Sequence, residues 1–214
     1  ITQTGVAYYM DPRNFLSDRF IFQFQALNYD NNFASTYINA VTNIIGSSSV
    51  YKYHLNLGTN LAELINSNGQ ALNVSPIFTA SRILQELGNS DTLYSLYSGN
   101  YVADANTTYG QKFIELTGNA SAYKGYYNFY NFGVSDSCVQ NYGTAYCGLN
   151  YAYRQGWNSV SAAIQGGLKQ IANNYIANNQ NTGYLQKFNV NQSNSEEIAT
   201  HQYMTNVAAP SSES

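Results

Sequence analysis

Residues 75–88 read SPIFTASRILQELG, and this stretch decides the fold that we predict. Ser75 is a favoured N-cap residue, and Pro76 suits the first position of a helix. Gly88 can adopt the left-handed conformation with which many helices end. Between these signals the apolar residues are Ile77, Phe78, Ala80, Ile83, Leu84 and Leu87. We therefore predict a deeply buried helix from residue 76 to residue 87.

Glu86 lies in the last turn of this predicted helix. Charged residues make up only 10% of the chain, whereas about 25% is usual, so each well-placed acid is a candidate for function. The helix dipole disfavours a carboxylate at a helix C-terminus, so a Glu without a function is less expected there. Partial burial would favour the protonated form that a general acid needs. The plain alternative is a surface carboxylate.

Arg82 stands one helical turn before Glu86, so the two side chains could pair. A direct ion pair would stabilise the carboxylate and would oppose general-acid function. We therefore expect the Arg82 side chain to point away from Glu86.

Further helices are predicted on both sides of this stretch. Asp11 and Pro12 favour the start of a helix that continues from residue 13 to residue 28. Residues 88–131 are rich in Gly, Asn, Ser and Tyr, and they indicate a long, irregular lobe that contains β-structure. The remaining expectations are helices at 34–45, 60–72, 149–154 and 160–175, a loop at 47–58, and a polar segment from 178 onward that wraps the body.

Composition excludes several classes of function. The net charge is −3 and no cluster of Lys and Arg occurs, so nucleic-acid binding is not expected. No apolar run approaches the roughly 18–20 residues of a membrane span. His54 and His201 are isolated, so we expect no metal site, and we expect no cofactor. Gly166 and Gly167 lack the preceding strand and the spacing of a phosphate-binding loop, which leaves close helix packing as their expected role.

The two cysteines, Cys138 and Cys147, lie nine positions apart in a loop-like stretch. In a chain rich in Tyr, Asn and Ser, a disulfide that closes a short loop is the expected arrangement, with two free thiols as the alternative.

A second candidate site is the aromatic run GYYNFYNFG at residues 125–133. If the run is extended, alternation puts Tyr126, Asn128 and Tyr130 on one side of it. Amides beside aromatic rings can hold a hydroxyl or an acetamido group. The candidate substrate-binding residues are Tyr127, Asn128, Phe129, Tyr130 and Asn131. A core strand with two polar gaps is the alternative.

The segments 81–86 (SRILQE) and 126–133 (YYNFYNFG) together resemble the bacterial endo-β-N-acetylglucosaminidases of glycoside hydrolase family 73. Segments 8–16, 180–190 and 201–206 are also similar to the autolysin subgroup of that family. The resemblance thus extends from about Tyr8 to Pro210.

This resemblance implies a mainly α (α+β), lysozyme-like fold, in which a helical lobe and a small β-containing lobe flank a substrate cleft. It implies cleavage of the N-acetylglucosaminyl-β-1,4-N-acetylmuramic acid bond of peptidoglycan, with Glu86 at the position of the general acid. Two alternatives stay open: a lytic transglycosylase, and a non-catalytic domain that binds the cell wall.

Two routes are open for the second catalytic group. Many family members carry another acid before the aromatic motif. This lobe offers Asp91, Asp104 and Glu115, and only Glu115 lies close to the motif. In an inverting reaction Glu115 or Asp136 would activate water. In a substrate-assisted reaction the 2-acetamido group of the sugar attacks instead, with Tyr127 or Asn128 as its clamp. We favour substrate assistance, because no obvious partner for Glu86 stands out.

The organisation that we expect is one glucosaminidase catalytic domain over residues 1–214. The first residues, ITQTG, read like the interior of a longer chain, so we expect the domain to come from a larger secreted protein. The expected setting is the bacterial cell wall, the expected partner is the glycan strand of peptidoglycan, and we expect a monomer.

Overall fold

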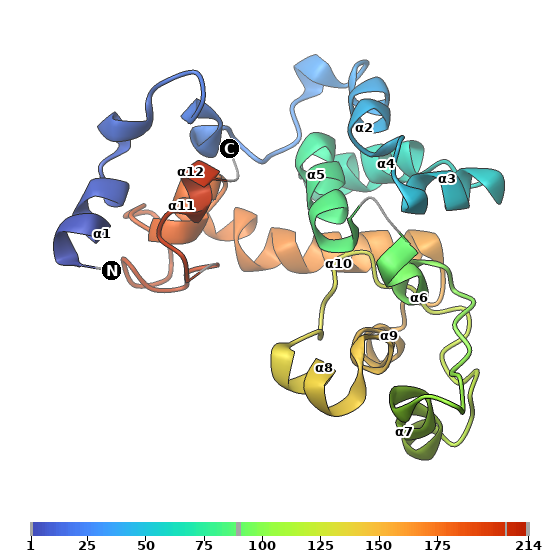
Figure 1. Cartoon of the computed structure of the whole chain (residues 1–214). Helices are drawn as coiled ribbons and strands as arrows, with labels where there is room; N and C mark the ends of the chain where they lie inside the picture. Colours follow the sequence, from blue (N-terminus) through green and yellow to red (C-terminus); the bar gives the residue numbers. More distant parts are fainter. Residues whose placement is uncertain (1, 89–90, 204, 213–214) are drawn as a thin grey trace. The chain divides into compact units, whose positions relative to one another are not determined.

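The computed structural model describes residues 2–88, 91–203 and 205–212, and within these ranges the secondary structure is helical (Figure 1). The prediction of a mainly helical protein is confirmed. The chain divides into two compact units. Unit 1 comprises Ile1–Tyr29 and Gln170–Ser214, and unit 2 comprises Asp30–Lys169.

Unit 2 carries the helix that was predicted at residues 76–87. Its elements are η3 (Asn31–Phe33), α2 (Tyr37–Ile45), α3 (Ser49–Asn56), α4 (Leu61–Leu72), α5 (Pro76–Leu87), η4 (Asp91–Leu93), α6 (Tyr94–Tyr97), α7 (Thr108–Thr117), α8 (Asp136–Tyr142), α9 (Thr144–Gln155) and the first part of α10 (Val160–Asn174).

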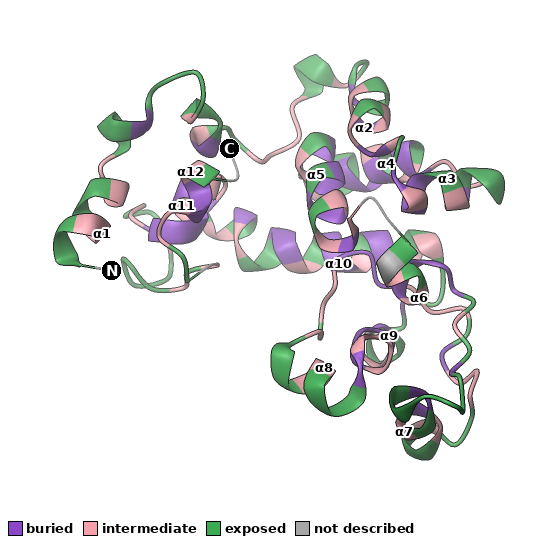
Figure 2. Ribbon diagram, viewed as in Figure 1, coloured by how far each residue is buried: buried purple, intermediate pink, exposed green. Residues whose placement is uncertain are grey.

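The core of unit 2 forms where α2, α4 and α5 pack against one another. Val41, Leu61, Ile65 and Ile83 are fully buried, and Figure 2 shows the buried residues of these helices in purple. Each of these helices has its apolar residues at helical spacing, so packing removes one continuous face from water. The predicted helices at 60–72 and 76–87 are confirmed as α4 and α5.

Unit 1 is held by α11 (Gly183–Phe188) and by the turns that surround it. The Tyr184 hydroxyl donates to the carbonyl oxygen of Met10 at 2.6 Å, and its ring lies 5.1 Å from that of Phe24. Lys187 is buried, and its Nζ donates to Gln202 at 2.8 Å. The other elements of unit 1 are α1 (Gln3–Met10), η1 (Pro12–Phe15), η2 (Ile21–Phe24), η5 (Ile176–Asn178) and α12 (Ala209–Ser212).

Two predictions of secondary structure were wrong. Residues 13–28 do not form one helix: Asp11 caps only the short turn η1, and a second turn, η2, follows. The aromatic rings explain this, because Phe15 packs on Tyr8, Tyr9 and Phe20 and holds the chain in a tight turn. Residues 47–58 are not a loop, since they contain α3, which Ser48 caps by accepting from the N–H of Tyr51.

The predicted β-containing lobe is not seen, because the described residues between 88 and 131 form α6, α7 and turns without a strand. Two backbone bonds do join this region in an antiparallel sense: Asn128 N–H to Leu96 and Gly125 N–H to Gly99, each at 2.7 Å. They are three residues apart, whereas a β-ladder repeats every two. Gly99 and Gly125 also have φ of +67° and +85°, so the chain turns where a strand would extend.

The two glycines of α10 act in packing, as the sequence predicted. A Cβ on Gly166 would overlap the indole of Trp157, and a Cβ on Gly167 would overlap the ring of Tyr130. Their absence of side chains lets two large aromatic residues lie directly on the helix backbone. Within the described ranges, no helix combines the length and the apolar character needed to cross a membrane.

Candidate active site

Glu86 occupies the last turn of α5, half-buried at the edge of a buried face. Ile83 and Leu87 are buried on either side of it in sequence, and 27% of the Glu86 side chain is exposed. Gly88 ends the helix with φ +70°, and its N–H bonds the carbonyl of Leu84. A carboxyl group is therefore held at a fixed point beside solvent by a helix that cannot shift without disturbing the core.

Arg82 does contact Glu86, so the expectation that it points away was wrong. Its Nη1 lies 3.8 Å from Oε1 of Glu86 and donates a shorter bond, 2.6 Å, to Oε1 of Gln85. Burial explains the contact, because only 8% of the Arg82 side chain is exposed and a buried guanidinium takes the polar groups within reach.

The segment after α5 joins α3 to the aromatic run. In four consecutive residues, Leu96 to Gly99, each backbone carbonyl accepts a hydrogen bond from another segment. The carbonyls of Leu96 and Gly99 accept from the aromatic run, as described above. Those of Tyr97 and Ser98 lie 2.8 Å from Nε2 of His54 and 3.1 Å from the hydroxyl of Tyr53. We call residues 96–99 the seam.

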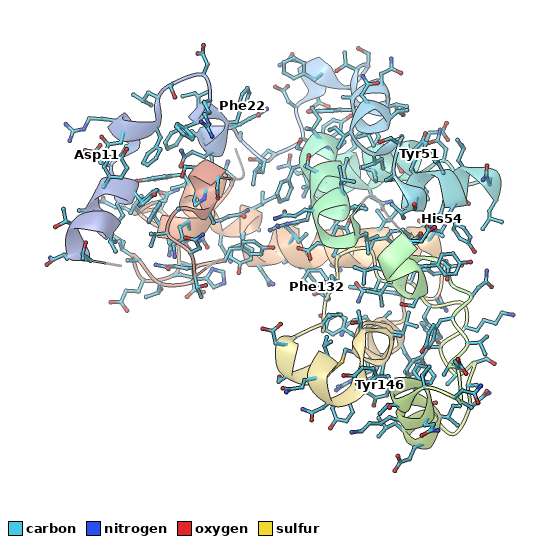
Figure 3. All side chains as sticks on the ribbon, viewed as in Figure 1. Asp11, Phe22, Tyr51, His54, Phe132 and Tyr146 are labelled. Carbon is cyan, nitrogen blue, oxygen red and sulfur yellow. A yellow bond between two sulfur atoms is a disulfide. The ribbon has the colours of Figure 1, made fainter. Side chains whose placement is uncertain are left out.

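His54 is the buried centre of the aromatic cluster next to the seam. Figure 3 labels it on α3, and its ring lies between 5.2 and 6.3 Å from the rings of Tyr53, Phe129, Tyr127 and Tyr97. Burial lowers the pKa of His54, and the bond to the Tyr97 carbonyl opposes this in part. The imidazole is thus a neutral donor in the folded protein.

Asn128 holds the aromatic run in its turn. Its Nδ2 donates to the carbonyls of Phe132 and Gly148 at 2.8 and 3.0 Å, and its Oδ1 accepts from the N–H groups of Tyr130 and Phe132 at 3.3 and 3.2 Å. The side chain is fully buried. The run is not extended, so the alternation predicted for it does not apply, and the Asn128 amide is committed to backbone groups.

The other predicted binding residues divide by exposure. Phe129 and Tyr130 are buried, and Tyr130 donates to the carbonyl of Ile164 at 3.1 Å. Tyr127 and Asn131 are partly exposed. Burial raises the pKa of the Tyr127 hydroxyl, and the nearby Tyr53 adds to the effect. Only Tyr127 and Asn131 thus present atoms to solvent, while Phe129 and Tyr130 support the run from beneath.

The structure does not bring Glu115 to Glu86. Glu115 is exposed on α7, and Figure 1 shows α7 apart from α5, with α6 between them. Asp136 is exposed at the start of α8, which also lies apart from α5. The helix of Glu86 packs chiefly against α2 and α4, and neither acid lies on those two helices.

The predicted disulfide is present. Cys138 and Cys147 are bonded, and their bond ties α8 to the first turn of α9. The carbonyl of the next residue, Gly148, is one of the two that accept a hydrogen bond from Nδ2 of Asn128. The crosslink therefore stabilises the helix against which the aromatic run is anchored. No group of three His, Cys, Asp or Glu suited to a metal ion occurs among the residues that the structure describes.

Sequence reasoning missed Tyr97, and it gave His54 and Asp91 no part in the site. The Tyr97 hydroxyl donates to Oδ1 of Asp91 at 2.9 Å, and Asp91 itself is exposed at the start of η4. A signal for His54 was available: Ser48 is a good N-cap, and Val50, Tyr51 and His54 share helical spacing. The Tyr97–Asp91 pair had no comparable signal, because it depends on how the chain turns after α5.

The fold is that of bacterial glucosaminidases. The crystal structure of S. aureus glucosaminidase B matches with a TM-score of 0.66 at 20% identity, over 99% of this chain and 69% of that one. A catalytic mutant of S. aureus autolysin E, in complex with the disaccharide NAG-NAM, matches with a TM-score of 0.54 at 20% identity, over 100% of this chain and 74% of that one.

The sequence comparisons agree with the fold. A beta-N-acetylglucosaminidase of Bacillus subtilis (strain 168) is 29% identical over 206 residues, which are 94% of this chain and 19% of that protein. A bifunctional autolysin of Staphylococcus epidermidis is 32% identical over 134 residues, which are 63% of this chain and 8% of that protein. No family model matches the chain.

The chain is thus a homologue of bacterial beta-N-acetylglucosaminidases and autolysins, and the resemblance that the sequence indicated is confirmed. It spans about a fifth of the length of the Bacillus relative, 19%, and a smaller share, 8%, of the autolysin.

Proposed function

We propose that this chain hydrolyses the N-acetylglucosaminyl-β-1,4-N-acetylmuramic acid bond within peptidoglycan strands, with Glu86 as the general acid. The observation that carries the proposal is the placement of Glu86: a partly exposed carboxyl at the end of a buried helix, in a glucosaminidase fold. The names of the relatives support the reaction class.

In the proposed reaction Glu86 donates its proton to the glycosidic oxygen as the C1–O bond breaks. The resulting carboxylate then takes a proton from the water that completes hydrolysis. Arg82, 3.8 Å away, would stabilise the carboxylate in this second half of the cycle. One side chain thereby serves first as acid and then as base.

The separation of α5 from α7 supports substrate assistance over an inverting reaction with Glu115 as base. An inverting pair requires two carboxyl groups about 6.5–9.5 Å apart across the sugar. In the substrate-assisted route the acetamido oxygen of the N-acetylglucosamine residue attacks C1, so Glu86 needs no facing carboxylate as nucleophile or base.

We also propose that the chain acts outside the cell on the bacterial wall, as a monomeric catalytic domain of a longer secreted protein. The greater length of the relatives is in line with this. The net charge of −3 gives no long-range attraction to a polyanionic wall, so targeting would come from other modules.

The test is mass spectrometry of borohydride-reduced fragments after digestion of purified peptidoglycan. We expect reduced N-acetylglucosamine ends from the wild type and a loss of about 10²–10⁴-fold in Glu86→Gln. Glu196→Gln, at an exposed position in unit 1, is the matched control and should digest normally.

Other outcomes have definite meanings. Anhydromuramic ends would make the protein a lytic transglycosylase, and binding without products from the wild type would favour a wall-binding domain. If Glu115→Gln alone lost as much rate as Glu86→Gln, the substrate-assisted route would be wrong.

A further inference from the structure

Asp91 is an acid that the proposed reaction has not used. It begins η4, five residues after Glu86, so even a fully extended chain would place the two backbones within about 17 Å. Glu86 is in the last turn of α5, and Asp91 follows that end of the helix. Both acids therefore belong to the same end of α5, and both reach solvent.

The Asp91 carboxylate is held in place by the buried phenol of Tyr97. The hydroxyl of Tyr97 donates to Oδ1 of Asp91 at 2.9 Å, while the Tyr97 residue is only 1% exposed. Burial first, and then the bond to Asp91, raises the pKa of Tyr97 far above neutral pH. The phenol therefore remains a donor at every working pH and holds one carboxylate oxygen in place.

Tyr97 is itself immobilised by the seam. Its carbonyl accepts a hydrogen bond from Nε2 of His54, and its ring packs edge-on against Tyr53 and Tyr94 at 5.9 and 5.5 Å. The neighbouring carbonyls of Leu96 and Ser98 are also bonded to other segments. The exposed carboxylate of Asp91 is thus bonded to a Tyr97 side chain that cannot rotate, and this is the pre-organisation that a catalytic group needs.

Substrate assistance is made more effective by such a group. As the acetamido oxygen bonds to C1 and the leaving oxygen takes the Glu86 proton, positive charge develops on the acetamido nitrogen. A carboxylate that accepts the acetamido N–H orients the nucleophile and stabilises this charge. Water then adds at C1, the C1–O bond to the acetamido oxygen opens, and Glu86 recovers its proton from the water.

Resting on the proposed function, we propose that Asp91 is this group: a further catalytic residue that accepts the acetamido N–H of the sugar whose glycosidic bond is cleaved. Tyr97 is the positioning residue that holds it. Other acids of unit 2 are less suited: Asp104 is occupied by the N–H and side chain of Asn106, and Glu115 lies on α7.

The test measures binding of NAG-thiazoline, a stable analogue of the cyclised intermediate, by calorimetry. Glu86→Gln should bind it about as well as the wild type, because the leaving group is absent from the analogue. Asp91→Asn should bind about 10- to 100-fold more weakly, the usual consequence of losing a charged hydrogen bond. Asp18→Asn, at an exposed position in unit 1, is the matched control.

Each result has one consequence. Unchanged thiazoline binding in Asp91→Asn would overturn the inference, as would a wild type that releases reduced N-acetylglucosamine ends yet does not bind the analogue. Both results leave the proposed hydrolysis standing. Absence of hydrolysis by the wild type would instead remove the proposed function and the inference together.

Tyr97→Phe keeps the buried ring and removes only the bond to Asp91. We expect kcat to fall about ten-fold with little change in KM, since one positioning bond is lost. If Asp91→Asn fails to fold, Tyr97→Phe tests the inference by itself. A kcat equal to that of the wild type would then overturn the roles proposed for Asp91 and Tyr97.

Discussion

The Nε2 atom of His54 lies 2.8 Å from the carbonyl oxygen of Tyr97, and this bond joins α3 to α6 across 43 positions of sequence. A carbonyl can only accept, so Nε2 carries a proton, and the lowered pKa favours the neutral form of the ring. Protonation of the other nitrogen would place a charge within an aromatic cluster, and the pKa of His54 is lowered for that reason.

The lowered pKa predicts that stability falls in acid. The unfolded chain takes up a proton near the ordinary value of 6.5, while the folded chain resists it until lower pH. Unfolding therefore becomes easier as pH drops below about 6.5, with a slope of at most about 1.4 kcal/mol per pH unit. Urea unfolding of the wild type and of His54→Gln between pH 5 and 7.5 measures this slope. The slope should be shallower in the variant, and identical slopes would contradict the assignment.

Asn128→Leu should destabilise unit 2 strongly. The substitution leaves two carbonyls and two N–H groups without the partner that Asn128 supplies, and each such buried group costs about 1–3 kcal/mol. We expect a loss of at least about 3 kcal/mol in urea unfolding. Asn158→Leu, at an exposed position, should change stability by less than about 0.5 kcal/mol. Similar losses in both variants would contradict the role given to Asn128.

The disulfide should contribute about 2–3 kcal/mol, because it closes a short loop between positions separated by nine. The double variant Cys138→Ser, Cys147→Ser tests this by urea unfolding against the oxidised wild type. The reduced wild type is the internal control and should match the double variant. If reduction left the midpoint unchanged, the crosslink would have no stabilising role.

Gly99→Ala and Gly118→Ala form a matched pair. Both glycines have positive φ, +67° and +73°, so alanine is strained at each by about 1–2 kcal/mol. A Cβ on Gly99 would also overlap the phenol of Tyr127, while nothing lies near that point at Gly118. We expect Gly99→Ala to lower the thermal midpoint further than Gly118→Ala and to displace Tyr127, with reduced hydrolysis. Equal midpoints would show that Tyr127 moves away at no cost.

The sequence was informative where local signals agree with one another. At α5 the Ser75 cap, Pro76, the apolar period and Gly88 all indicate the same boundaries, so the position of Glu86 on a buried helix followed from them. At η1 the Asp11 cap was equally good, yet the helix ended after one turn. The reason lies in the packing of Phe15 with Tyr8 and Tyr9, which a cap does not encode.

The site beyond Glu86 depends on contacts between distant residues. Asn128 was predicted as a ligand-binding amide, but its bonds to Phe132 and Gly148 form only when the run turns and α9 packs beside it. The Arg82–Glu86 contact follows from burial of the guanidinium, which helical spacing alone does not reveal. Sequence patterns identified which residue types could do chemistry, and packing decided which of them are free to do it.

The bond from the Gly125 N–H to the Gly99 carbonyl closes the base of the excursion formed by residues 100–124, which contains α7. Its two ends meet at one point, so a longer or shorter excursion would change the closure entropy only slowly. An insertion or a deletion within residues 100–124 would therefore cost little stability, and it would leave the helix that carries Glu86 in place.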